Sequence, residues 1–208
     1  GYSDVLVSAY VYDAGLTNEG RVFAFHGSAG GLVTEPNWIM DGNQAGGYFG
    51  RSVAAAGDVN GDGYGDVIIG ASGYDRGQTD EGEAFIFLGG PNGLASRTFW
   101  ISEANQANAL YGFSVAGAGD VNADGLADVV VGAYKYDAGE IDEGRAFLYL
   151  GGAAMSTNAA WTFDGNQVSA YLGNSVAGAG DANGDGFSDV IVGAYRHDGS
   201  AADQGRAY

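Results

Sequence analysis

Short apolar runs recur along the chain, separated by clusters of glycine, aspartate and asparagine, the residues that turns favour. Residues 66–71 (DVIIGA) form a β-branched run typical of a strand buried on both faces. Residues 83–88 (EAFIFL) are aromatic and aliphatic and end at a Gly-Gly pair, which also predicts a strand. Residues 49–57, rich in alanine, and a run centred on 98–101 (TFWI) complete a set of four short strands. No window shows a helical apolar period of sufficient length, so the pattern predicts an all-β fold.

The strand pattern repeats along the whole chain. The segment that begins at Asp58 returns at Asp120 and at Asp181, at intervals of 62 and 61 residues. The run that begins at Asp66 has an earlier copy that begins at Asp4. We therefore expect one repetitive region over 1–208, with three, four, four and three strands in successive units. The units are 1–48 (partial), 49–110, 111–171 and 172–208 (partial).

Four-stranded units that repeat in sequence are typical of the blades of a β-propeller. The coils of a β-solenoid are shorter, and the strands of a sandwich do not repeat in sequence. The repeat length of 61 or 62 residues is long for the common WD and kelch blades.

Two short motifs identify the kind of blade. Phe49-Gly50 opens a unit, and Gly70-Ala71-Ser72 follows its second strand. In this order the units resemble FG-GAP repeats, the blades of the integrin α-subunit head and of related extracellular propellers. The resemblance covers essentially all of 1–208. The departures are Tyr111-Gly112 and Leu172-Gly173 in place of Phe-Gly, and Ser72, Tyr134 and Tyr195 in place of the family's proline.

The resemblance implies a propeller that closes with seven blades, of which this chain would hold about 3.5. We expect the chain to be part of such a seven-bladed propeller and a piece of a longer polypeptide. The alternative is that copies join through their open edges into a ring or a fibre, because unpaired edge strands favour pairing between chains.

The segment from Asp58 to Asp66 (DVNGDGYGD) carries oxygen side chains at its positions 1, 3, 5 and 9. Alternate oxygens on a tight loop can converge on one hard cation, while a glycine at position 6 permits the turn and a carbonyl at position 7 adds a ligand. A set of ligands made only of oxygen selects calcium over transition metals. An EF-hand is excluded because its twelfth position is a glutamate, whereas here it is Ile69, Val131 or Val192.

The resemblance implies that these loops bind calcium in the hairpin between the first two strands, about one ion per complete loop and three in the chain. Asp4 would be the ninth-position ligand of a fourth loop. The alternative is an Asx-rich turn without a metal, although three clustered aspartates would then repel one another. The ligand sets carried over are Asp58, Asn60, Asp62 and Asp66 with the carbonyl of Tyr64; Asp120, Asn122, Asp124 and Asp128 with that of Leu126; and Asp181, Asn183, Asp185 and Asp189 with that of Phe187.

Composition narrows the classes of partner. The chain has 208 residues and a formal net charge of −18, from 26 Asp and Glu against 8 Lys and Arg. Because this excess would repel phosphates, no nucleic-acid partner is expected. The absence of cysteine excludes disulfides and thiolate zinc sites. No apolar stretch approaches the ~18 residues that span a bilayer, so membrane insertion is not expected.

The connection between the second and third strands is also acidic, as in Tyr74-Asp75 to Asp80-Glu81-Gly82. Its paired carboxylates could act as general acid and base or bind further cations. We favour the interpretation that they cap turns and face water, because catalytic groups rarely repeat in every blade. Every acidic cluster is taken to be repeated and none unique, so no catalytic residue is assigned and the chain is not expected to be an enzyme.

One tryptophan per unit lies in the fourth strand. Trp38, Trp100 and Trp161 are expected to pack between adjacent blades, with stacking against sugars as the alternative. The pairs that follow them are expected to pin the crossing between blades: Asn43-Gln44, Asn105-Gln106 and Asn166-Gln167.

These observations favour a non-catalytic extracellular or cell-surface propeller, stabilised by calcium, that mediates adhesion, ligand binding or assembly. Two alternatives remain open: a structural subunit of an extracellular fibre or matrix joined through blade edges, and an accessory carbohydrate-binding propeller of a secreted enzyme. The ligand, whether protein or glycan, is not identified by the sequence.

Overall fold

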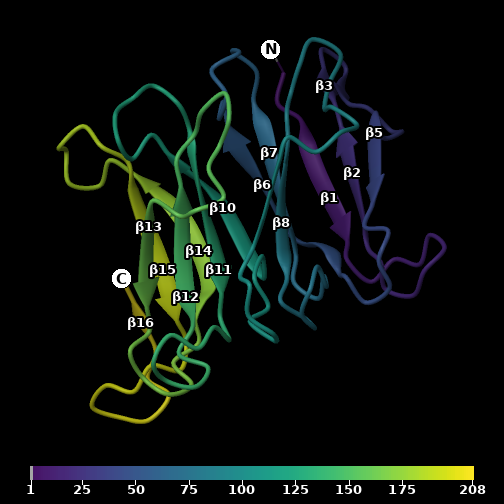
Figure 1. Cartoon of the computed structure of the whole chain (residues 1–208). Helices are drawn as coiled ribbons and strands as arrows, with labels where there is room; N and C mark the ends of the chain where they lie inside the picture. Colours follow the sequence, from purple (N-terminus) through teal and green to yellow (C-terminus); the bar gives the residue numbers. More distant parts are fainter. Residues whose placement is uncertain (1) are drawn as a thin grey trace.

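The computed structural model describes residues 2–208, which form four larger antiparallel β-sheets that stand side by side in sequence order and one two-stranded hairpin. Figure 1 shows this succession from the purple first sheet to the yellow last one. Residues 2–208 form no helix, and therefore none that is long and apolar enough to cross a membrane. The all-β prediction is confirmed, and the sheets have the form of propeller blades.

Each sheet follows the chain from its first strand to its last. The bounds are β1 (Val5–Ala9), β2 (Arg21–Phe25) and β5 (Trp38–Asp41) in the first sheet; β6 (Phe49–Gly57), β7 (Asp66–Ala71), β8 (Glu83–Phe87) and β9 (Trp100–Glu103) in the second; β10 (Ser114–Gly119), β11 (Asp128–Ala133), β12 (Arg145–Tyr149) and β13 (Trp161–Asp164) in the third; and β14 (Leu172–Gly180), β15 (Asp189–Ala194) and β16 (Arg206–Ala207) in the fourth. The expected series of three, four, four and three strands is confirmed.

Four details differ from the expectation. The fourth strands begin at the tryptophan and extend beyond it, and β10 begins at Ser114 rather than at the Tyr-Gly pair. A two-residue hairpin of β3 (Gly27–Ser28) and β4 (Gly31–Leu32), which the sequence did not predict, precedes β5. Trp161 is 39% exposed and stacks on Phe163, so of the three tryptophans only Trp38 and Trp100 are enclosed between sheets.

The core lies between successive sheets rather than within one. Every residue of β7 and of β11 is buried, as expected for strands covered on both faces. Along β7, Val67 and Ile69 pack toward the first sheet and Ile68 toward the third, because successive side chains point to opposite faces. β15 follows the prediction only in part, since Ile191 is 45% exposed.

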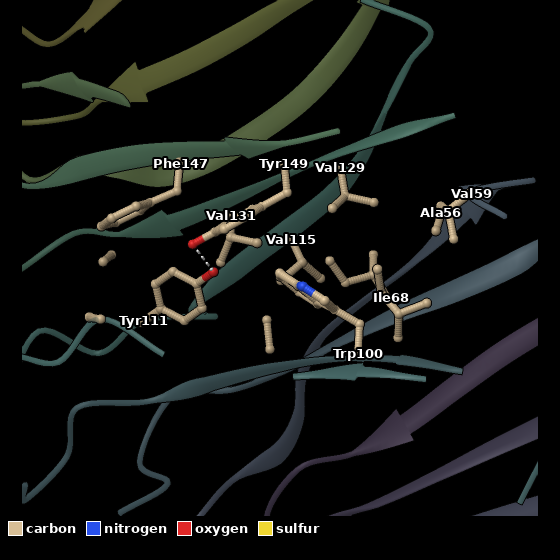
Figure 2. Close-up of a cluster of buried hydrophobic side chains, with 14 of the residues drawn as sticks. Ala56, Val59, Ile68, Trp100, Tyr111, Val115, Val129, Val131, Phe147 and Tyr149 are labelled. Carbon is tan, nitrogen blue, oxygen red and sulfur yellow. Dashed lines mark hydrogen bonds between the residues drawn. The ribbon is translucent and has the colours of Figure 1, made fainter. Parts of the chain in front are cut away.

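Figure 2 shows the cluster between the second and third sheets, where Trp100 and Ile68 meet Val115, Val129 and Tyr149. The ring centroids of Trp100 and Tyr149 lie 4.8 Å apart at an interplanar angle of 67°. Such edge-to-face contacts add to the hydrophobic gain from burial. The indole Nε1 of Trp100 also donates a hydrogen bond of 3.0 Å to the carbonyl of Ser156 in the next unit.

The two motif glycines bring adjacent blades into backbone contact. Gly112 has φ of +76°, a left-handed conformation that glycine adopts at no steric cost. A Cβ added to Gly70 would lie 1.9 Å from the carbonyl oxygen of Gly112. The first strands also approach closely, because a Cβ on Gly117 would lie 2.7 Å from the carbonyl oxygen of Ala55. The small residues of the repeat are therefore required by the spacing between sheets.

The Asn-Gln pairs pin the crossing between blades, as expected. The Gln106 side chain donates to the carbonyl of Asp137 at 2.9 Å and accepts from the Asp137 amide at 2.7 Å. Gln44 clamps Asp75 in the same way, at 2.8 and 2.6 Å. One glutamine in each crossing thus fixes the position of the next blade's connection between its second and third strands.

Candidate metal centres

The three acidic loops lie where the sequence placed them, in the hairpins β6–β7, β10–β11 and β14–β15. Successive loops are tied together by backbone hydrogen bonds. The carbonyl of Asp58 accepts from the amide of Ala127 at 2.9 Å, and that of Asp120 accepts from the amide of Ser188 at 2.9 Å. All three loops therefore form a continuous row at one end of the sheets.

Within the first loop, the leading aspartate organises the turn. Asp58 Oδ1 accepts the amides of Gly61 and Asp62 at 2.8 and 3.1 Å, and its Oδ2 accepts the amide of Gly63 at 2.7 Å. Asn60 accepts from the amide of Asp62 at 3.0 Å. These are Asx-type turns, which explain the preference for Asp and Asn at alternate positions.

The ninth-position aspartate closes the loop from inside. Asp66 is 1% exposed, and its carboxylate accepts the amides of Val59 and Gly89, both at 2.8 Å. Asp128 holds Val121 in the same way, also at 2.8 Å. The ninth position thus fastens each loop to the start of its own second strand.

In the first two loops the ninth-position aspartate has a raised pKa. Burial raises the pKa of Asp66, and the charges of Asp62 and Asp58 raise it further, while the two amides oppose the rise. The pKa of Asp128 is raised for the same reason. In the third loop, hydrogen bonds led by the amide of Gly186 lower the pKa of Asp181, whose site is open to water.

In the part of the chain that it describes, the structure does not show the convergence of oxygens that the sequence suggested. Among residues 2–208, no three acidic, histidine or cysteine side chains gather in a metal-binding arrangement. The carboxylate oxygens of Asp58 and Asp62 instead accept amides of their own loop. The donor set still fits a hard cation, because each carboxylate oxygen has two acceptor positions and can keep one amide while binding a metal.

The acidic connections between second and third strands are turn caps, as expected, but their glutamates do not face water. Asp75 Oδ1 accepts the amide of Asp80 at 2.6 Å. Glu143 accepts the amides of Ala138, Gly139 and Glu140 within 2.9 Å. Its exposed fraction is 2%, and that of the equivalent Glu81 is 1%. The backbone amides compensate for the loss of water around each buried carboxylate.

The interpretation that no acidic cluster is unique is wrong at one place. Glu83 begins β8, whereas the corresponding strands begin with arginine at Arg21, Arg145 and Arg206. Glu83 and Glu103 face each other across β8 and β9. Alignment of the third strands alone would have found this exception.

Comparison with known proteins agrees with the repeat. Three segments, residues 49–87, 111–148 and 172–208, match the family described as FG-GAP repeat. Integrin alpha-IIb of Mus musculus is 36% identical over 141 residues, which is 64% of this chain and 14% of that protein. Integrin alpha-6 of Homo sapiens is 34% identical over 160 residues, covering 76% and 13%. Integrin alpha-PS2 of Drosophila melanogaster is 32% identical over 194 residues, covering 83% and 14%. The chain thus spans about a seventh of the length of these relatives.

Proposed function

The chain belongs to the FG-GAP repeat family, and from this premise we propose that it is a calcium-stabilised, non-catalytic propeller module that mediates adhesion or ligand binding outside the cell. Its blades are proposed to divide at 1–48, 49–110, 111–171 and 172–208. The integrin α relatives support a binding module at the cell surface rather than an enzyme.

One observation carries the calcium proposal. Three loops with the same oxygen side chains stand in register in one row, joined by backbone hydrogen bonds between neighbours. Each loop brings three carboxylates onto nine residues, and burial already raises the pKa of two ninth-position aspartates. A divalent cation would offset the mutual repulsion of the three carboxylates in each loop.

We assign one calcium to each loop. The ligands in the first are Asp58, Asn60, Asp62, Asp66 and the carbonyl of Tyr64, and the equivalent residues serve in the other two. Calcium would stabilise the row by holding the loop ends that carry the inter-sheet hydrogen bonds.

Chelation tests the proposal. At a hundredfold excess of calcium over the dissociation constant, each site adds roughly 3 kcal/mol. A chain of this size loses about 2–4 °C of melting temperature per kcal/mol, so loss of one ion should lower the melting temperature by about 6–12 °C and loss of all three by up to about 20–35 °C. Asp58→Asn should abolish one site, while Asp75→Asn in a turn cap serves as control. An equal melt in calcium and in chelator refutes the metal assignment.

A second candidate, assembly of copies into a fibre or matrix, is favoured by the uncovered face of the first sheet. Val5 is 42% exposed and Val7 47% on β1. Light scattering in calcium buffer separates the two functions. A mass many times that of one chain supports assembly, and a mass of one chain excludes it.

A further inference from the structure

An ion pair between the third and fourth strands recurs in this chain. In the first sheet, Arg21 donates to both oxygens of Asp41, with Nε–Oδ1 2.5 Å and Nη2–Oδ2 2.9 Å. Its guanidinium lies 4.5 Å from the centroid of the Tyr12 ring. In the third sheet, Arg145 makes the same two hydrogen bonds to Asp164 at the same distances. The shared arrangement is a guanidinium held by a fourth-strand carboxylate and a tyrosine ring.

The second sheet departs from this arrangement by an exchange of charges. Glu83 takes the place of the arginine and lies directly opposite Glu103, which takes the place of the aspartate. The tyrosine remains, as Tyr74. An arginine appears instead in the preceding connection, as Arg76, where the first and third sheets have alanine.

In the second sheet a single guanidinium, that of Arg76, lies near two carboxylates. Arg76 Nε forms an ion pair with Glu83 and lies 3.9 Å from Glu103 Oε2. The Glu83 side chain is fully buried. Among residues 2–208, Glu83 Oε2 and Glu103 Oε2 have no hydrogen-bond partner. A buried carboxylate with an unpaired oxygen is costly, and two carboxylates here share one guanidinium where each counterpart carboxylate has its own.

The pKa values of both glutamates, Glu83 and Glu103, are raised. Burial raises the pKa of Glu83 to about 7, with Glu103 and Glu81 adding to the rise and Arg76 opposing it. Burial also raises the pKa of Glu103. Tyr74 faces the same carboxylates, and its own pKa is raised by burial and by Glu83.

Glu103 lines a pocket of about 190 Å³ at the outer edge of the second sheet. The pocket is lined by Arg76, Ile101, Ser102, Glu103, Asn105 and Asn158. The Glu103 side chain is 24% exposed and that of Arg76 48%, so solvent reaches both. The pocket therefore combines an accessible carboxylate with neutral hydrogen-bonding groups.

We propose that this pocket binds the guanidinium group of an arginine side chain presented by a protein partner, which donates to the solvent-exposed side of Glu103. A guanidinium is planar, weakly hydrated and carries five N–H donors, so it suits a carboxylate flanked by neutral hydrogen-bonding groups better than a compact ammonium or metal ion does. The two carboxylates of Glu83 and Glu103 disfavour an anion. The site goes beyond the proposed function, because it requires no calcium and lies at the blade edge, apart from the calcium loops.

A model arginine tests the proposal directly. The 208-residue chain is titrated at pH 8 with Nα-acetyl-arginine-N-methylamide, and the side-chain carboxyl resonances of its glutamates are followed by ¹³C NMR. We expect saturable shifts at Glu103 and Glu83, none with the neutral citrulline analogue, and weaker affinity at pH 5, where the Glu83 carboxyl is protonated. Absence of a saturable shift at pH 8, or equal shifts with citrulline, overturns the proposal.

Variants separate binding from folding. The double substitution Glu83→Arg with Arg76→Ala installs the residues of the first and third sheets, so that the chain supplies its own guanidinium and binding should disappear with the fold intact. Glu103→Gln keeps the size of the side chain and should also abolish binding, as read from the Glu83 resonance. Glu140→Gln, in an exposed connection of the third sheet, is the control and should bind like the parent. Retained binding in Glu103→Gln refutes the site.

Discussion

A buried hydroxyl network between the second and third sheets allows a quantitative test of the core. Tyr111 donates to the Tyr149 hydroxyl at 2.8 Å, and Ser102 donates to the same oxygen at 3.1 Å (Figure 2 shows the tyrosine pair). All three residues are at most 3% exposed. At the preceding interface the equivalent residues are apolar: Met40, Phe49 and Phe87.

The position of each hydroxyl decides the cost of its removal. Tyr111→Phe removes one donor but leaves Tyr149 bonded to Ser102, so it should cost about 1 kcal/mol. Tyr149→Phe leaves two buried hydroxyls without a partner and should cost roughly 2–4 kcal/mol. The triple variant Ser102→Met, Tyr111→Phe, Tyr149→Phe reproduces the preceding interface. It should cost at most about 1 kcal/mol, because no buried polar group then remains unpaired.

Urea unfolding and thermal melts in calcium buffer measure these differences. Tyr149→Phe should lower the melting temperature by about 5–15 °C, given the ~2–4 °C that each kcal/mol represents at this chain length. Tyr195→Phe, at a side chain 51% exposed, is the control and should change stability by less than about 0.5 kcal/mol. A triple variant as unstable as Tyr149→Phe would refute the reasoning, as would equal costs for the two single tyrosine substitutions.

Three further predictions concern other interfaces. Because the folded pKa of Glu83, about 7, exceeds its ordinary 4.5, its contribution to stability should be full below pH 4.5 and fall by up to about 3 kcal/mol as pH rises through 7; urea midpoints at pH 5 and 8 should show this fall in the parent but not in Glu83→Gln. Gly70→Ala should cost about 3 kcal/mol or prevent folding, since its Cβ would lie 1.9 Å from the Gly112 carbonyl. Gly193→Ala, where the nearest atom is 3.7 Å away, should cost less than about 0.5 kcal/mol in the same melts. Gln106→Ala removes two hydrogen bonds between blades and should cost about 1 kcal/mol, whereas a cost of zero would show that the clamp follows the packing rather than supporting it.

The sheets could be predicted from sequence because the repeat restates the same physical requirement in every unit. The run at β7 is apolar on both faces since sheets cover it on both sides. The motif glycines are needed where two backbones meet, as at Gly70 and Gly112. The Asp and Asn spacing places the three loops correctly because those side chains also build the turns.

What the sequence did not predict depends on contacts between units. Glu81 looks like a water-facing turn residue, yet the amides of Arg76 and Gln78 satisfy its carboxylate at 2.7 and 3.1 Å and permit burial. Trp161 is 39% exposed, whereas Trp100 is 4% exposed and donates to Ser156 of the next unit, a contact that the local sequence does not show. The pairing of Glu83 with Arg76 breaks the repeat, so averaging over units conceals it.

Calcium binding by the loop row is the central claim, and isothermal titration of the calcium-stripped chain tests it most directly. The account predicts saturable binding of three calcium ions per chain, reduced to two by Asp120→Asn and unchanged by Asp137→Asn in a turn cap. Absence of saturable binding, or a stoichiometry that Asp120→Asn leaves unchanged, would contradict it.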